Sequence, residues 1–231
     1  MSKWIRRKRN SWGFGVQSPT DFHFVQHVLR EEASYYGYAD LRALEPRFST
    51  DLPHYPENIN RLLFRLTNYI HPEIIIEVGT GSGLSACAMA LAHPLGKCVT
   101  IGTGTANLTE AQAALADCAH ITVKSGNEIV LFEEMISDEK ELTEKIEPIE
   151  LLHIAQTIHY KEIILKALQH IGDKALIIIE GIRDNDEKRI WWKELRDNQP
   201  TGIYYDLGCI GLILFDKSRP KNIYWVDIQK K

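Results

Sequence analysis

One short segment of the chain combines a carboxylate with three closely spaced glycines. An apolar run ends at Glu77, and Gly79, Gly81 and Gly83 follow before Ser85 enters a helix-forming stretch. Glycine has no Cβ, so it adopts positive φ angles and lets a ligand approach the backbone N–H groups closely. In an α/β sheet such a turn faces a crevice suited to a nucleotide-like ligand. The acid before the glycines favours a ligand with an amine or a sulfonium over one with a pyrophosphate.

Two familiar glycine motifs do not fit this segment. A dinucleotide fingerprint needs glycine at the sixth position counted from Gly79, and Leu84 stands there. A phosphate-binding P-loop ends in Gly-Lys-Ser/Thr, and the segment contains no lysine. A strand-to-helix turn without a ligand stays open as an alternative, although a bare turn rarely needs three glycines.

Short apolar runs alternate with helical patterns through the middle of the chain, which predicts a parallel sheet covered on both faces. Three later strands are separated by only a few residues, which predicts antiparallel pairing. The expected fold class is therefore α/β, a doubly wound, mostly parallel sheet closed by an antiparallel edge. The expected strands are 74–78, 98–101, 121–124, 149–154, 175–180, 202–207, 210–215 and 223–228, and the expected helices between them are 84–91, 109–117, 128–145, 159–171 and 186–197.

A helical N-terminal extension is expected over residues 1–55, ahead of the main domain at 56–231. Ser18 followed by Pro19 is typical of a helix start, with Ser18 as the N-cap. A second helix is expected from Pro56 to the residues before His71. The expected inner face of the first helix comprises Phe22, Val25, Val28 and Leu29.

Five basic residues lie at the start of the chain, at positions 3 and 6–9. We interpret them as a solvated, frayed terminus, with contact to RNA or a membrane surface as the alternative. The net charge of −4 disfavours a nucleic-acid partner for the whole chain. No apolar run approaches the roughly 20 residues that a bilayer crossing needs, so no membrane partner is expected.

Cysteine usage indicates a reducing compartment. Cys87, Cys98, Cys118 and Cys209 form no CxxC pair and no metal-like cluster with histidine. We interpret them as buried thiols and expect a cytoplasmic location, because no signal-peptide core follows the basic start.

The segment Glu77-Val-Gly-Thr-Gly-Ser-Gly83 resembles the first motif of class I S-adenosylmethionine-dependent methyltransferases, in the version found in small-molecule O-methyltransferases. The stretches Phe14-Gly-Val-Gln-Ser-Pro19 and Arg61-Leu-Leu-Phe-Arg65 resemble the lead-in of a bacterial branch of that group, and Trp192 and Asp206–Phe215 its closing helix and hairpin. The resemblance implies a Rossmann-like methyltransferase fold and S-adenosyl-L-methionine as the cofactor.

The same resemblance implies roles for six residues. Glu77 would lie near the methionine amino group, Ser85 would help to hold the carboxylate, and Asn127 would contact the adenine. Gly79, Thr80 and Gly81 would lie under the cofactor.

Three strand ends lack the acids typical of the family. Gly102 stands where an acid usually grips the ribose, and Ala155 and Gly181 stand where aspartates serve metal or cofactor. Only Glu180 keeps a carboxylate beside them. Magnesium prefers several oxygen ligands, so no divalent metal is expected.

No residue can be assigned as catalytic from the sequence. His159 and Tyr160 follow the fourth strand and are candidates for a general base, although a surface histidine at a helix start is the more ordinary interpretation. Asp184 and Asp186 are interpreted as helix-capping residues and His153 as a core residue. Of Trp191 and Trp192, adjacent on a helix, one should belong to the core.

The sequence therefore predicts a methyltransferase that methylates the hydroxyl of a small molecule. The alternative is a catalytically degenerate methyltransferase-like protein that binds or scaffolds, since fold alone does not establish activity. RNA modification through the basic start is a third hypothesis. A homodimer formed through the closing strands is a further one.

Overall fold

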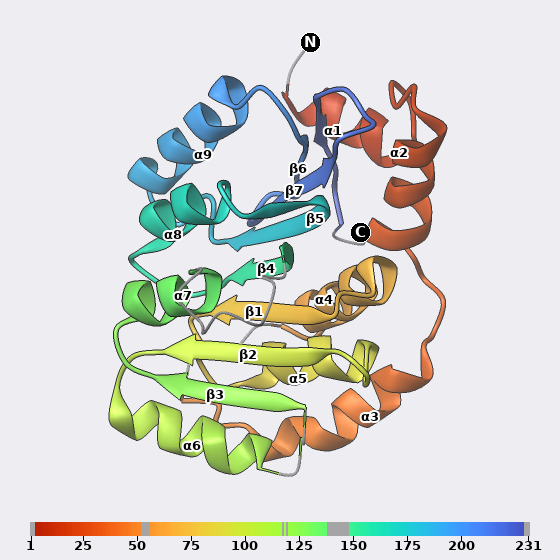
Figure 1. Ribbon diagram of the computed structural model, residues 1–231. Helices are drawn as coiled ribbons and strands as arrows, with labels where there is room; N and C mark the ends of the chain where they lie inside the picture. Colours follow the sequence, from red (N-terminus) through yellow and green to blue (C-terminus); the bar gives the residue numbers. More distant parts are fainter. Residues whose placement is uncertain (1–2, 52–55, 117, 119, 138–147, 229–231) are drawn as a thin grey trace.

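An eight-stranded sheet forms the centre of the molecule, in the order β3-β2-β1-β4-β5-β7-β6-β8 (Figure 1). The computed structural model describes residues 3–51, 56–116, 118, 120–137 and 148–228. Strands β3, β2, β1, β4 and β5 are parallel, and β7 runs antiparallel to both β5 and β6. The strands are β1 (Ile74–Val78), β2 (Lys97–Gly102), β3 (Ile121–Ser125), β4 (Ile149–Ile154), β5 (Ile171–Glu180), β6 (Ile203–Asp206), β7 (Ile210–Asp216) and β8 (Asn222–Trp225).

The central strands are apolar on both faces because helices cover both faces. Along β1, Ile75 belongs to the core on one face, and Ile76 and Val78 belong to the core on the other. The first face packs against α2 (Pro19–Phe24), the π-helical turn η1 (Val25–Leu29), α4 (Glu57–Ile70) and α5 (Leu84–Ala92). The second packs against α7 (Glu128–Ile136), α8 (Tyr160–Ala167) and α9 (Asp186–Asn198).

A smaller apolar cluster lies outside the sheet. It joins α3 (Tyr36–Leu44) and α6 (Thr105–Leu115) to α5. The short 3₁₀ turn η2 (Glu45–Arg47) follows α3. These elements give the predicted doubly wound α/β fold, and the antiparallel strands β7 and β6 follow the parallel strands as expected.

The last strand was wrongly expected to pair antiparallel. Strand β8 lies beside β6 and runs parallel to it. The short connection from Asp216 to Asn222 does reverse the chain relative to β7. Because β6 lies between β7 and β8 and itself runs opposite to β7, the reversal makes β8 parallel to β6.

Several boundaries differ from those expected. The helix predicted over 159–171 ends at Ala167, because Ile171 already pairs with Ile149 and begins β5. The helix predicted over 109–117 begins at Thr105. The helix predicted over 128–145 is present to Ile136, and residues 138–147 of that prediction lie outside the described residues.

The Ser18 cap is confirmed, since its Oγ accepts a hydrogen bond from the N–H of Asp21. On the inner face of this segment, Phe22 was predicted wrongly. Its ring is 42% exposed, while Phe24 is fully buried, because the segment passes from α-helix to π-helix at Val25 and departs from a regular helical period.

The prediction of buried thiols is confirmed for two of the four cysteines. Cys87 and Cys98 are buried, Cys118 is half-buried, and Cys209 is exposed. Cys209 lies in the tight turn between β6 and β7, where its side chain is not enclosed by either layer of helices. Within the described ranges, no helix combines the length and the apolar composition that a bilayer crossing requires.

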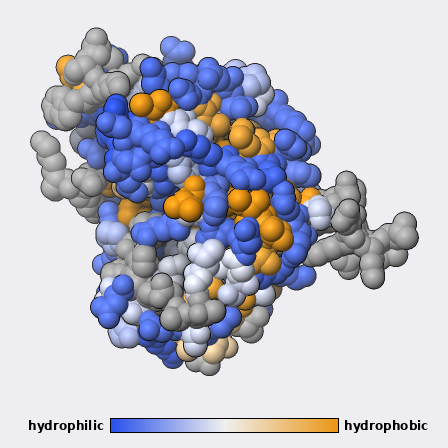
Figure 2. Space-filling model, turned by 90° about the vertical axis from the view of Figure 1, so that its left-hand side faces the viewer, coloured by the Kyte–Doolittle hydropathy of each residue, from blue (hydrophilic) through white to orange (hydrophobic). Residues whose placement is uncertain are grey.

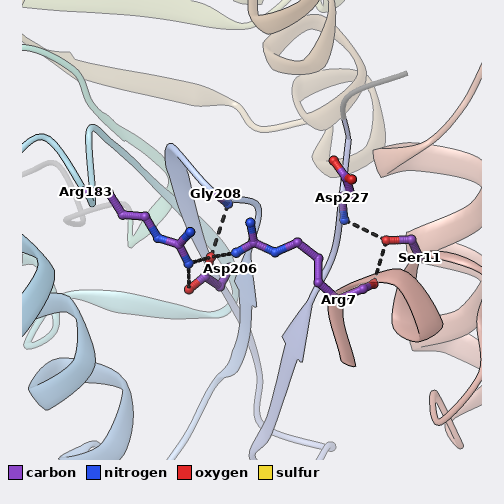
Figure 3. A network of polar contacts seen from close by, with 6 residues as sticks. All are labelled: Arg7, Ser11, Arg183, Asp206, Gly208 and Asp227. Carbon is purple, nitrogen blue, oxygen red and sulfur yellow. Dashed lines mark hydrogen bonds and ion pairs between the residues drawn. The ribbon is translucent and has the colours of Figure 1, made fainter. Parts of the chain in front are cut away.

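The basic start of the chain is not frayed. Residues Lys3–Ser11 form α1, which packs beside β8 (Figure 1). Arg7 donates to Asp206 Oδ1 at 2.7 Å, and Arg183 donates to both oxygens of the same carboxylate at 2.9 and 3.0 Å (Figure 3). The amide of Gly208 donates to Oδ1 as well (Figure 3). Asp206 at the end of β6 therefore ties α1 to the loop after β5.

A second buried carboxylate ties α2 to the closing strands. Asp21, 1% exposed, accepts hydrogen bonds from Tyr205 at 2.8 Å and Tyr224 at 2.9 Å, and it also pairs with Arg219. A buried charge is tolerated only with such partners.

We expect Asp206→Ala to lower the free energy of unfolding by about 3 kcal/mol, because it leaves two guanidinium groups and the Gly208 amide without their shared acceptor. Urea denaturation measures the change. Asp173→Ala, which removes an exposed ion pair with Lys217, is the control and should change stability little. Equal stability of the two variants would contradict the role given to Asp206.

Candidate functional site

Four polar side chains lie in a row across the sheet, on the face covered by α4 and α5. They are Thr100 of β2, Glu77 of β1, His153 of β4 and Glu180 of β5, and all are buried. The parallel register sets Glu77 opposite Thr100 on one side and opposite His153 on the other. Because these four strands are neighbours, the row joins the turn after β1 to the end of β5.

Glu77 takes part in three hydrogen bonds within this row. Ser85 and His153 contact Oε1 at 2.6 and 2.9 Å, and Thr100 contacts Oε2 at 2.6 Å. The Thr100 oxygen also lies 2.8 Å from the Thr80 hydroxyl. Since a hydroxyl has one proton and a carboxylate only accepts, Thr100 donates to Glu77 and accepts from Thr80.

His153 bridges two carboxyl groups. Its Nε2 lies 2.7 Å from Glu180 Oε1, while its Nδ1 faces Glu77. Burial raises the pKa of Glu180 well above its ordinary value. Each ring nitrogen of His153 that carries a proton donates to the carboxylate oxygen that it faces. The predicted core position of His153 is confirmed, and its two acidic partners were not foreseen because they come from strands far apart in the sequence.

The glycine turn lies between β1 and β4, where the strand order reverses. Gly79 has φ +101°, and a Cβ there would lie 2.7 Å from the backbone nitrogen of Gln156. Gly83 has φ +90° and packs against Leu115 of α6. The glycines therefore serve close packing between the turns after β1 and β4 as well as backbone conformation.

The structure brings most of the predicted site residues together. Glu77, Gly79, Thr80 and Ser85 are buried around the turn, and Gly81 is half-buried. Asn127 lies apart, at the end of β3, where its Oδ1 caps α7 by accepting from the N–H groups of Ile129 and Val130. The cofactor contacts assigned to these six residues stay predictions.

A cavity of about 830 Å³ opens at the carboxyl ends of β4 and β5. Its lining includes Asn58, Gln156, Tyr160, Glu180, Lys188 and Cys209. Among the described lining residues none belongs to the glycine turn, and Gln156, packed on Gly79, is the link between them. Figure 2 views the molecule from this edge of the sheet and shows a mostly hydrophilic surface with small apolar patches near its middle.

Lys188 is the residue of this cavity that the sequence did not reveal. It lies in the first turn of α9, is 6% exposed, and its ammonium lies 4.9 Å from the ring centroid of Tyr160. Burial lowers the pKa of Lys188. A lysine in the first turn of a helix of alternating charges looks like a surface residue, so only the packing of α9 against the sheet identifies it.

The other candidates occupy ordinary positions. Tyr160 is buried, lines the cavity and packs edge-on against Trp191. His159 precedes α8 and is half-buried. Trp192 is the core member of the tryptophan pair, as expected. The N-cap of α9 is Asn185, whose Oδ1 accepts from the Lys188 amide, so the capping role predicted for Asp184 and Asp186 is wrong.

At two of the three positions that lack an acid, a side chain would be crowded by its neighbours or strained in its backbone. A Cβ at Gly102 would lie 2.8 Å from Thr80 Oγ1 and 2.9 Å from Leu108 Cδ2. Gly181 has φ +64°, and a Cβ there would lie 1.9 Å from Asp184 Oδ2. The neighbouring side chains thus fill the space of the missing acids. No three His, Cys, Asp or Glu side chains in the described ranges are grouped so that they could hold a metal ion.

The fold matches that of solved methyltransferases. The O-methyltransferase TomG from Streptomyces achromogenes, solved with SAM, is 17% identical at a TM-score of 0.59, over 80% of this chain and 91% of its own. The O-methyltransferase from Bacillus cereus, solved with SAH, is 17% identical and has a TM-score of 0.59. The match covers 82% of this chain and 96% of the Bacillus chain. The SAH-bound methyltransferase PaMTH1 from Podospora anserina is 13% identical and has a TM-score of 0.61. The match covers 87% of this chain and 97% of the PaMTH1 chain. No family model matches the chain, and neither does any curated protein. The chain therefore has the Rossmann-like methyltransferase fold.

Glu180→Gln is expected to weaken the dependence of stability on pH. Because burial raises the pKa of Glu180, the folded protein keeps a proton that the unfolded chain has lost. This contribution is fully present below about pH 4.3 and is lost as the pH rises through the folded-state pKa. The difference in free energy of unfolding, wild type minus variant, should therefore fall between pH 4.5 and 8 in urea denaturation. Glu187→Gln, at a mostly exposed carboxylate, is the control. A difference that stays constant or rises would refute the burial effect.

Gly102→Asp should destabilise the protein by about 1 to 3 kcal/mol, because the new Cβ overlaps Thr80 and Leu108. Thermal and urea unfolding measure the change. Ser125→Ala, at the exposed position opposite Gly102 on β3, should stay within about 0.5 kcal/mol of wild type. A Gly102→Asp variant as stable as wild type would show that the space is not filled.

Proposed function

We propose that this protein is an S-adenosylmethionine-dependent methyltransferase that methylates the hydroxyl of a small molecule. The observation that carries the proposal is the glycine turn with Glu77 and Ser85, placed beside a cavity in a fold shared with O-methyltransferases solved with SAM or SAH. The strand order reverses at this turn, which is where open α/β sheets bind their ligands.

The residues at the turn fit the methionine end of that cofactor. A carboxylate offers about four acceptor positions, and Glu77 uses three of them, two on Oε1 and one on Oε2. One position on Oε2 remains for an ammonium group. Ser85 and the amides of the turn would hold the carboxylate of the same ligand.

The residues expected to contact the ribose of the cofactor fit it less well. Gly102 offers no carboxylate, and losing a charge-assisted acceptor costs roughly tenfold in affinity. We therefore expect binding weaker than that of a protein with the acid in place.

The cofactor supplies an already activated methyl group, so the protein has to align the acceptor and help to remove its proton. The cavity suits this task, because it carries apolar residues such as Ile59 and Ile210 beside Tyr160, Glu180 and Lys188. Apolar walls exclude water and strengthen the effect of the few charges that remain. We expect the reaction to proceed without a divalent metal, since Glu180 alone offers too few oxygen ligands.

A second candidate function is a methyltransferase-like binding or scaffold protein without activity. The observation that favours it is the loss of space at Gly102 and Gly181, where Thr80, Leu108 and Asp184 occupy the places of the absent acids. Cofactor binding without methyl transfer to any hydroxylated acceptor would support this candidate.

Isothermal titration of the wild-type protein with S-adenosylmethionine and with S-adenosylhomocysteine should show binding at millimolar concentrations or below. Glu77→Gln and Ser85→Ala should each weaken the affinity about tenfold, because each removes part of the polar set at the methionine end. Thr122→Ala, at an exposed position of β3, is the matched control and should bind as wild type does. If neither ligand produces heat at millimolar concentration, the proposed function is refuted.

A further inference from the structure

Two polar groups that line the cavity have unused hydrogen-bonding capacity. Glu180 Oε2 is shielded from solvent and accepts no hydrogen bond within the described part of the chain. Lys188, on α9, lines the same cavity and forms no salt bridge among the described residues; its ammonium faces the Tyr160 ring. By contrast, Lys161 lines the cavity with its ammonium paired to Glu187 at 2.6 Å.

Glu180 cannot satisfy Oε2 by turning away. Its other oxygen is held 2.7 Å from His153 Nε2, and His153 is itself held by Glu77 on the far side. A buried oxygen without a donor costs free energy. This cost is relieved by one ligand group that donates to Oε2 and also accepts from the Lys188 ammonium, which lines the same cavity.

A hydroxyl group is the simplest group that does both. A carboxylate would only accept, and an ammonium would only donate. The surrounding wall offers a face of Tyr160 and the apolar side chains of Ile59 and Ile210 to the rest of the ligand. The chemistry thus matches an alcohol or a phenol carried on an apolar body.

We propose that the cavity seats the acceptor hydroxyl between Glu180 and Lys188, and that Glu180 removes its proton during methyl transfer. This inference rests on the proposed function. The flexible Lys188 side chain turns from the Tyr160 ring toward the hydroxyl as it enters, and its ammonium then donates to the hydroxyl oxygen.

The step balances within these groups. The hydroxyl O–H bond breaks and its proton goes to Glu180 Oε2. The oxygen forms a new bond to the methyl carbon as the bond from sulfur to that carbon breaks, and the electron pair of the broken bond stays on sulfur. The products are a methyl ether, a neutral thioether and a protonated Glu180, which His153 holds in place from Oε1.

The electrostatics of the cavity support this role. Burial raises the pKa of Glu180, and a carboxylate with a raised pKa is a stronger base toward a hydroxyl. The positive charge of Lys188 opposes that rise and favours the ionised carboxylate. The same charge stabilises the oxyanion that develops on the acceptor.

The experiment uses phenol as the probe and anisole, its methyl ether, as the probe without a hydroxyl proton. Ligand-detected NMR titrations measure both affinities, with and without S-adenosylhomocysteine. Wild type should bind phenol more tightly than anisole. Glu180→Gln and Lys188→Met should each weaken phenol binding about tenfold and leave anisole binding unchanged. Lys193→Met, at an exposed position of α9 outside the cavity, is the matched control and should bind phenol as wild type does. Thermal melts confirm that each variant is folded.

A second measurement tests the removal of the proton. Transfer of labelled methyl from S-adenosylmethionine to phenol should fall at least about 100-fold in Glu180→Gln, because the amide cannot take the proton. Transfer that is equal in Glu180→Gln and wild type, or absent from a wild type that binds both ligands, overturns the role as base.

The remaining outcomes separate this inference from the proposed function. If phenol does not bind wild type, or binds all variants equally, the proposed hydroxyl-binding site between Glu180 and Lys188 is refuted, even where the cofactor binds. The protein could instead bind phenol through Glu180 and Lys188 but fail to bind S-adenosylmethionine. That result overturns the proposed function and supports the hydroxyl-binding site between Glu180 and Lys188.

Discussion

The buried carboxylate of Glu77 is the group on which the rest of the site depends. A charge with no exposed surface is tolerated only where its oxygens are satisfied, and here the donors come from α5, β2 and β4. These contacts hold the start of α5, and with it the glycine turn, against the middle of the sheet. The same carboxylate orients His153, which in turn holds Glu180 at the edge of the cavity. One polar row thus connects the turn that would hold the methyl donor with the wall that would hold its acceptor.

The missing acids have a different meaning once the packing is known. On sequence alone, Gly102 and Gly181 are positions where the methyltransferases that the chain resembles usually carry a carboxylate. In the structure they are positions where a Cβ has no room, because Thr80, Leu108 and Asp184 fill the space. A side chain at either position would require its neighbours to move, whereas Glu77, Glu180 and Lys188 are buried charged groups already in place. This arrangement is compatible with methyl transfer without a metal and with a binding role.

The central part of the fold followed from local patterns. Apolar runs with helices between them predicted all five parallel strands, and β1 and β4 have the predicted ends. The errors occur where contacts between distant segments decide. The pairing of β8 depends on which side of β6 it occupies, and the docking of α1 depends on Asp206, about 200 residues later in the chain. The burial of Lys188 depends on how α9 packs on the sheet, which the charges of that helix do not reveal.

The sequence by itself determined the α/β class, the strand that ends at Glu77 and the turn of three glycines after it, because each follows from residues that are neighbours in the chain. Only the tertiary structure decided which groups share a site. Parallel strands bring their carboxyl ends to one edge of the sheet, so Glu77 contacts Thr100 and His153, and His153 in turn contacts Glu180. Lys188 joins them from a helix that the strand order places over the opposite face. Hydrogen bonds between strands and packing between layers determine which side chains lie together, and neither can be deduced from the local order of residues.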